Sequence, residues 1–260
     1  MKSYHSITET PGQKATEEQI ARIYHRYRFA KEFAKAKDVL EIACGSGIGL
    51  GFLAGIARSM VGGDIDKTNV EIASGLYKNT SIQIKEMDAH KLPFEDKSFD
   101  LVLLFEAIYY LKSPQAFLKE AARVLRSDGR LIICSVNKDW IDFHPSQYSC
   151  AYFSIPELNN LLNLDFREVR AFGAFSVEVK GLKSFLFSII KRTAVRFSLI
   201  PGSLSARAYM KRIFMGPLKP LPNQVYAGMA PYEPPTSIPK EKSTMDFKII
   251  YLSAMKREND

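Results

Sequence analysis

The stretch DVLEIACGSG, residues 38–47, joins a short apolar run to a glycine-rich turn. Val39–Ile42 is typical of a buried parallel strand, and the residues after the turn predict a helix up to about Ala57. Glycines at such a turn let the backbone approach a ligand closely, because no Cβ stands in the way. The stretch therefore predicts the first strand–turn–helix unit of an α/β fold, with a ligand site at its turn.

Strand and helix patterns alternate from this unit onward, which predicts a doubly wound, mostly parallel sheet. Further strands are expected at 59–65, 82–87, 99–105, 130–136, 166–172 and 247–255. We expect four regions: an N-terminal helical cap (1–37), the cofactor-binding core (38–172), a basic, helical and proline-rich insertion that caps the substrate (173–246), and the last strand with a tail (247–260).

Acidic residues mark the ends of the predicted strands. Glu41 adjoins the turn and suits a ligand with an ammonium group. Asp64 ends the second strand, where a carboxylate can accept hydrogen bonds from both hydroxyls of a ribose. Asp88 ends the third strand and can accept from an adenine amino group, while the Ala89 N–H donates to a ring nitrogen. Considered singly, each aspartate is better explained as a solvated charge at a strand end.

A nicotinamide-dependent oxidoreductase is the alternative from another enzyme class. Its dinucleotide fingerprint, G-x-G-x-x-G, fails in register because Leu50 stands at the third position after Gly47. Residues 49–54 match the variant that ends in alanine, but they begin inside the predicted helix, where they could not cradle a pyrophosphate. The failed register and Glu41 both disfavour this alternative.

Five blocks together resemble the class I S-adenosylmethionine-dependent methyltransferases, most closely the small-molecule branch with the ubiquinone and menaquinone C-methyltransferases. They are DVLEIACGSG (38–47), VGGDID (61–66), MDAHKLPFEDKSFDLV (87–102), FEAIYYL (105–111) and RVLRSDGRLIIC (123–134). The block at 87–102 is the most specific, since it joins the adenine-binding acid to the approach of the fourth strand. Ala43 departs from the family pattern, which more often has glycine there.

The resemblance implies a Rossmann-like, seven-stranded sheet whose last strand is antiparallel. It also implies S-adenosylmethionine as the cofactor and S-adenosylhomocysteine as the product. The cofactor would contact Glu41, Ala43, Gly45, Gly47, Asp64, Ile65, Asp88, Ala89, Phe105 and Glu106. We expect Arg28, from a stretch that can close over the cofactor, to bind its carboxylate; a packed amphipathic helix with a solvated charged face explains that stretch equally well.

A sulfonium methyl group is already activated, so the protein mainly aligns the acceptor and excludes water. An oxygen acceptor needs a general base, whereas an amine or a carbon acid needs less help. The catalytic candidates are Glu106, Tyr109 and His144, which follow the fourth and fifth strands. His144 is otherwise a surface residue of its loop, and Tyr109 a wall of the pocket. No cluster with metal-ligand spacing appears, and no metal is expected.

The net charge of +8 has a local origin, because residues 180–219 hold nine Lys or Arg and no Asp or Glu. Residues 182–216 fit a helix in peripheral contact with a membrane, a lid over an acidic acceptor, or a solvated surface pair of helices. Specific nucleic-acid binding is not expected, since no RNA-binding module is evident. A cytoplasmic protein is expected, because no secretory signal or spanning segment is visible and the three cysteines are scattered.

The sequence thus favours a methyltransferase for a small molecule, such as a glycan or lipid precursor with an anionic group. A non-catalytic module that binds S-adenosylmethionine is a further alternative, which turnover on an acceptor panel would exclude.

Gly45→Val is expected to abolish cofactor binding by placing a branched Cβ against the ligand, and Asp64→Ala to weaken it. Titration calorimetry with S-adenosylmethionine, S-adenosylhomocysteine and NAD checks both expectations. Wild-type affinity in Asp64→Ala would show that the ribose lies elsewhere, and binding of NAD alone would refute the methyltransferase interpretation.

Overall fold

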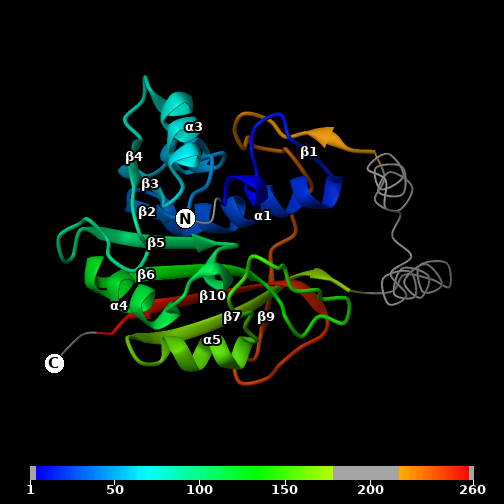
Figure 1. Ribbon diagram of the computed structural model, residues 1–260. Helices are drawn as coiled ribbons and strands as arrows, with labels where there is room; N and C mark the ends of the chain where they lie inside the picture. Colours follow the sequence, from blue (N-terminus) through cyan, green and yellow to red (C-terminus); the bar gives the residue numbers. More distant parts are fainter. Residues whose placement is uncertain (1–3, 178–216, 258–260) are drawn as a thin grey trace.

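Eight strands form the main sheet of the computed structural model, which describes residues 4–177 and 217–257 (Figure 1). In sheet order they are β4 (Gln83–Glu86), β3 (Ser59–Asp64), β2 (Asp38–Ile42), β5 (Phe99–Phe105), β6 (Leu125–Val136), β10 (Phe247–Lys256), β7 (Phe166–Ser176) and β9 (Thr236–Ile238). The five strands from β4 to β6 are parallel, and β10 runs antiparallel to both of its neighbours. The doubly wound sheet with an antiparallel last strand is therefore confirmed.

The eighth strand, β9, lies within the insertion, where we expected no strand. It pairs with β7 over only three positions, from Ala171 opposite Ile238 to Gly173 opposite Thr236. Pro235 and Pro239 bracket it, so the apolar pattern is too short to indicate a strand. Its position has a physical reason, because it covers hydrogen-bonding groups that β7 would otherwise leave exposed at the edge of the sheet.

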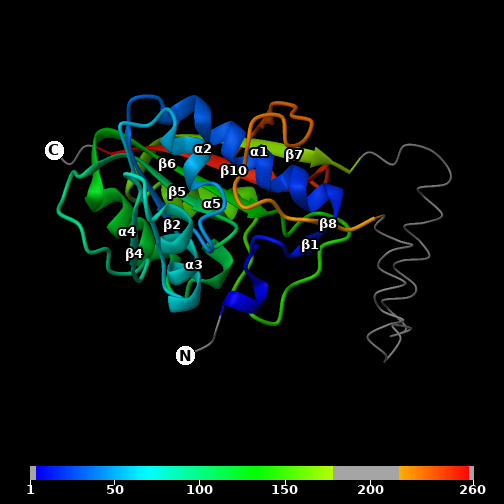
Figure 2. The same ribbon diagram turned by 90° about the horizontal axis from the view of Figure 1, so that it is seen from above.

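Helices cover both faces of the sheet (Figures 1 and 2). They are α1 (Glu17–Ala34), α2 (Leu50–Ala54), α3 (Lys67–Tyr77), α4 (Pro114–Val124) and α5 (Ile155–Leu162), with 3-10 turns at His5–Ile7 and Ile108–Tyr110. Alternate residues of β2 enter two separate cores: Val39 packs with α1 and α2, whereas Leu40 and Ile42 pack with α4 and α5. The helix after the glycine turn ends at Ala54, earlier than the sequence indicated.

Helix α1 has a capped first turn and one buried apolar stripe. Thr16 and Gln19 form a reciprocal capping box, in which the Thr16 hydroxyl accepts from the Gln19 N–H at 3.1 Å. The apolar stripe that includes Ile23, Tyr27 and Ala30 is buried against the sheet. Burying this stripe fixes the rotation of α1, and with it the side chains that point to the end of β2.

The described end of the insertion returns along the α1 side of the sheet. A two-residue strand, β8 (Lys219–Pro220), pairs with β1 (Lys14–Ala15). The Val225 N–H then donates to the Ile48 carbonyl at 2.8 Å. The predicted helices of 182–216 and most of the basic segment lie outside the described residues. Within 4–177 and 217–257, no helix has the length and hydropathy needed to cross a membrane.

Gly49→Ala is expected to destabilise the fold by about 1–3 kcal/mol, because a Cβ there would lie 1.9 Å from Cζ of the buried Tyr27 ring. Urea unfolding measures the loss. Gly75→Ala is the matched control: nothing lies within 4 Å of a Cβ at this exposed position of α3, so it should stabilise the helix by up to about 1 kcal/mol. Equal midpoints for Gly49→Ala and the wild type would contradict this packing.

Candidate active site

A cavity of about 520 Å³ lies where the carboxyl ends of β2, β3 and β5 meet, beside the residues that follow β4. Neighbouring parallel strands bring their ends to one edge, so the sheet order assembles residues far apart in sequence. Most of the predicted cofactor residues line this cavity: Glu41, Ala43, Gly45, Asp64, Ile65, Asp88, Ala89, Phe105 and Glu106. The volume is in the range of small-molecule sites.

The glycine turn is held in an unusual backbone conformation. Ala43 and Gly45 both lie in the left-handed region, with φ of 55° and 58°. Ala43 therefore carries a strain of about 1 kcal/mol that glycine would not. The Gly45 N–H donates to Oδ2 of Asp64 at 2.9 Å, so Asp64 ties the turn to the end of β3. A Cβ on Gly45 would lie 2.7 Å from Cγ2 of Thr8, which shows how closely the N-terminal segment approaches the turn.

Glu41 is a buried carboxylate, with only 1% of its surface exposed. The Tyr27 hydroxyl of α1 donates to its Oε1 at 2.7 Å, while Oε2 is buried without a hydrogen-bond partner. Burial raises the pKa of Glu41 to about 7. The free oxygen fits the ammonium group of a methionine moiety, since buried polar atoms without partners are rare and costly.

Asp88 also lines the cavity, and its carboxylate is more exposed to solvent than that of Glu41. Its Oδ1 accepts from the backbone N–H of His90 at 2.9 Å and lies 2.6 Å from Nδ1 of that ring. Burial raises the pKa of Asp88, but the hydrogen bonds from His90 outweigh this effect and leave the pKa below its usual value. Met87 and Ala89 on either side are buried, so the backbone that presents Asp88 is well anchored. This edge suits an adenine ring.

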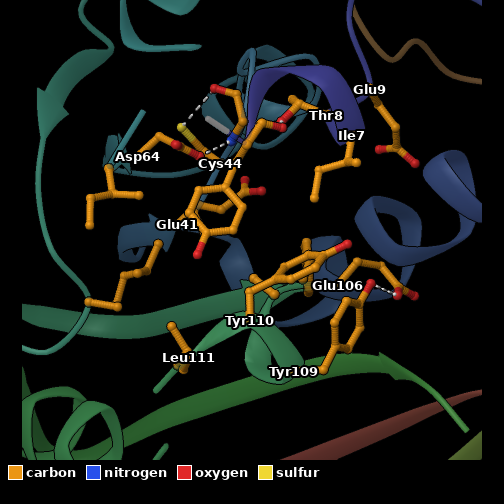
Figure 3. A pocket seen from close by; sticks show the side chains of 18 of the residues that line it. Ile7, Thr8, Glu9, Glu41, Cys44, Asp64, Glu106, Tyr109, Tyr110 and Leu111 are labelled. Atoms are coloured by element: carbon orange, nitrogen blue, oxygen red, sulfur yellow. Dashed lines mark hydrogen bonds between the residues drawn. The ribbon is translucent and has the colours of Figure 1, made fainter. Parts of the chain in front are cut away.

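The end of β5 carries a hydrogen-bonded pair of candidate catalytic groups. Glu106 has a left-handed φ of 51°, and its N–H donates to the Cys134 carbonyl at 2.8 Å. The Tyr109 hydroxyl donates to Oε2 of Glu106 at 2.8 Å (Figure 3). Burial and the Glu106 charge raise the pKa of Tyr109 well above its usual value. Tyr109 therefore stays protonated as a donor, which leaves Glu106 as the group able to accept a proton.

Three predicted residues do not reach the cavity. His144 is exposed in the loop that follows β6. Gly47 lies behind the turn, where its carbonyl accepts from the Tyr77 hydroxyl at 2.7 Å. Arg28 points away: its guanidinium lies over the Tyr232 ring at 4.8 Å and pairs with Glu32. The cavity wall instead contains Arg26, two positions earlier on α1.

Two groups of lining residues were missed from the sequence. The first is the polar face of α1 made by Gln19, Arg22 and Arg26, whose spacing of three and four marks one side of a helix. This spacing could have predicted that the three side chains lie together on one face of the helix. The second is residues 4–9, whose sequence has no pattern that indicates contact with a strand edge. Figure 3 shows Ile7, Thr8 and Glu9 along one rim of the cavity, opposite Tyr109, Tyr110 and Leu111.

Among residues 4–177 and 217–257, no group of three or more His, Cys, Asp or Glu is arranged to hold a metal ion. The cavity combines a glycine turn, acidic groups at the ends of four strands and a buried arginine. The fold is a Rossmann-like domain, and the chemistry of the cavity fits an adenosine ligand that carries an amino-acid end.

Residues 40–133 match the family model described as a methyltransferase domain. A probable S-adenosylmethionine-dependent methyltransferase of Mycobacterium tuberculosis is 35% identical over 112 residues, which cover 43% of this chain and 39% of the relative. Demethylmenaquinone methyltransferase of Tropheryma whipplei is 28% identical over 135 residues, covering 50% and 54% of the two chains. Over the matched residues the chain is similar to S-adenosylmethionine-dependent methyltransferases, and the match spans about two fifths to half of these relatives' length.

Solved structures support the same fold. A SAM-dependent methyltransferase of Thermotoga maritima aligns with a TM-score of 0.53 at 18% identity, covering 92% of this chain and 90% of that one. At this identity the likeness concerns the fold alone.

The raised pKa of Glu41 predicts a pH dependence of stability. The folded chain keeps this proton up to about pH 7, whereas an unfolded glutamate with its usual pKa of 4.5 has already lost it. The free energy of unfolding should therefore fall as pH rises from about 4.5 to 7, by on the order of 3 kcal/mol for this group. Urea unfolding of the wild type and Glu41→Gln across this range measures the effect. Parallel pH profiles would contradict the burial of an ionisable Glu41.

Proposed function

We propose that this chain transfers the methyl group of S-adenosylmethionine to a small molecule. One observation carries the proposal: Glu41, Gly45, Asp64 and Asp88 line a single cavity, with a buried carboxylate oxygen of Glu41 left unpartnered. The match to relatives whose names specify S-adenosylmethionine supports the choice of cofactor. A nicotinamide ligand fits less well, because its pyrophosphate would have to lie against acidic walls.

Each part of the cavity has a role in this proposal. Glu41 and Arg26 hold the amino-acid end, Asp64 with the adjacent Ile65 holds the ribose, and Asp88 with Ala89 holds the adenine. When bound, the cofactor supplies a sulfonium methyl group that is already activated for displacement. The chain itself contributes orientation of the acceptor and exclusion of water by the buried cavity walls around Phe105 and Tyr109.

The acceptor would enter beside Glu106, from the side formed by Tyr109, Tyr110 and α1. Glu106 removes the proton of an O–H acceptor, and the hydrogen bond from Tyr109 keeps its carboxylate oriented. Arg22, which pairs with Glu18, and Lys112 also line the cavity, and their positive charges support an acceptor with an anionic group, such as a glycan or lipid precursor. A cytoplasmic site of action is part of this proposal, supported by three cysteines that form no disulfide.

Glu106→Gln is expected to lower turnover by about 100-fold or more while S-adenosylhomocysteine still binds with near wild-type affinity, because the amide cannot accept a proton. Release of S-adenosylhomocysteine with a panel of anionic phenols, sugar acids and lipid precursors gives the rate, and calorimetry gives the affinity. Glu86→Gln, the same change at an exposed position at the end of β4 and outside the cavity, is the control.

Wild-type turnover in Glu106→Gln would remove Glu106 from the chemistry. Binding of S-adenosylhomocysteine without turnover on any acceptor would favour the non-catalytic module instead.

A further inference from the structure

Residues 4–10 run along the rim of the cavity, and hydrogen bonds attach them to the residues that follow β2 and β3. The backbone N–H groups of Tyr4 and His5 donate to Oδ2 of Asp66 at 2.8 and 3.1 Å. At the other end of the segment, the Ser46 hydroxyl in the glycine turn donates to the Glu9 carbonyl at 2.6 Å. These contacts place the Glu9 side chain inside the cavity, among the residues proposed to hold the cofactor.

Glu9 forms an ion pair there with Arg26 of α1. Both oxygens of the Glu9 carboxylate accept from the guanidinium, Oε1 from Nη1 at 3.3 Å and Oε2 from Nη2. Only 8% of the Arg26 side chain is exposed, against 37% for Glu9. A buried guanidinium requires an anionic partner, because an unpaired buried charge costs several kcal/mol. Glu9 supplies that partner from a segment that is also held by hydrogen bonds between Asn69 and the side chains of His5 and Thr8.

The same wall has polar atoms that Glu9 does not satisfy. Nε of Arg26 and Oε2 of Glu41 are both buried without hydrogen-bond partners. An α-amino-acid group offers the complement of this arrangement, an ammonium for Glu41 and a carboxylate for Arg26. A second carboxylate beside that of Glu9 would bring two like charges together in a buried site, which is unfavourable. The two carboxylates therefore compete for Arg26.

We propose that Glu9 is a built-in competitor of the cofactor: its carboxylate holds the position on Arg26 that the cofactor's carboxylate takes, and cofactor binding displaces Glu9 and loosens residues 4–10. This inference rests on the proposed function. The exchange leaves Arg26 paired in both states, so the buried charge never loses its partner during entry or exit. It also couples occupancy of the amino-acid subsite to the segment that covers the cavity.

Glu9→Gln tests the competition, because a neutral amide occupies the same space but pairs weakly with a guanidinium. We expect S-adenosylhomocysteine to bind roughly tenfold more tightly to this variant than to the wild type, since less of the protein is in the closed, competing state. 5′-Methylthioadenosine shares the adenosine and the thioether but lacks the amino-acid end, so its affinity should change less than about twofold. Calorimetry on the full chain gives both affinities.

Two further variants sharpen the comparison. Glu17→Gln is the matched control, because Glu17 pairs with Lys219 on the surface and does not line the cavity; neither affinity should change. The double variant Glu9→Gln/Arg26→Gln removes both charges and leaves no unpaired ion. In this double variant S-adenosylhomocysteine should lose its affinity advantage over 5′-methylthioadenosine.

Hydrogen exchange of residues 4–10 provides a readout independent of affinity. In the wild type, S-adenosylhomocysteine should accelerate exchange of the Tyr4 and His5 amides, whereas 5′-methylthioadenosine should not. Unchanged affinity for S-adenosylhomocysteine in Glu9→Gln, or an equal gain for both ligands, would overturn the competition. If neither ligand bound the wild type, the proposed function would fail and the competition with it.

Discussion

Glu41 places a carboxyl group in the interface between the sheet and α1, where only one of its two oxygens, Oε1, has a hydrogen-bond partner. A buried carboxylate is costly unless it is paired or hydrogen-bonded, so the position of α1 relative to β2 is constrained by the bond from the Tyr27 hydroxyl. Gly49 allows that arrangement, because any side chain there would overlap the Tyr27 ring. The oxygen left without a partner faces the same cavity as Arg26. Packing and the proposed ligand recognition thus depend on a single buried carboxyl group.

The cavity edge is organised by a second carboxylate. Asp64 accepts from the Gly45 N–H and, through its other oxygen, from the Asp66 N–H and the Asn69 side chain. Because Asp66 in turn accepts from the first residues of the N-terminal segment, the turn, the end of β3 and that segment form one hydrogen-bonded unit. Such connected polar groups are more rigid than their separate bonds suggest. Asp64 and Asp66 therefore hold the glycine turn and the first described residues of the N-terminal segment in one arrangement.

The sheet and its acidic strand ends could be predicted from the sequence, and the reason is local. Continuous apolar runs such as 99–105 indicate buried parallel strands, and parallel strands bring their ends to one edge. The strand β9 could not be predicted, since three residues between prolines carry no periodic pattern and pair only because β7 has a free edge. The exposed position of His144 could not be predicted either, because the path of a loop depends on what it packs against.

The α/β architecture, the family resemblance and the acidic residues at the strand ends can be derived from the amino-acid sequence, because each follows from short-range pattern and from the geometry of parallel strands. Three features depend on the three-dimensional packing: Arg26 rather than Arg28 enters the cavity, Glu9 pairs with Arg26 from 17 residues earlier in the chain, and the Tyr109 hydroxyl contacts Glu106. These outcomes depend on the rotation of α1 and on the path of the N-terminal segment. Both are set by packing against the sheet, which local sequence does not encode.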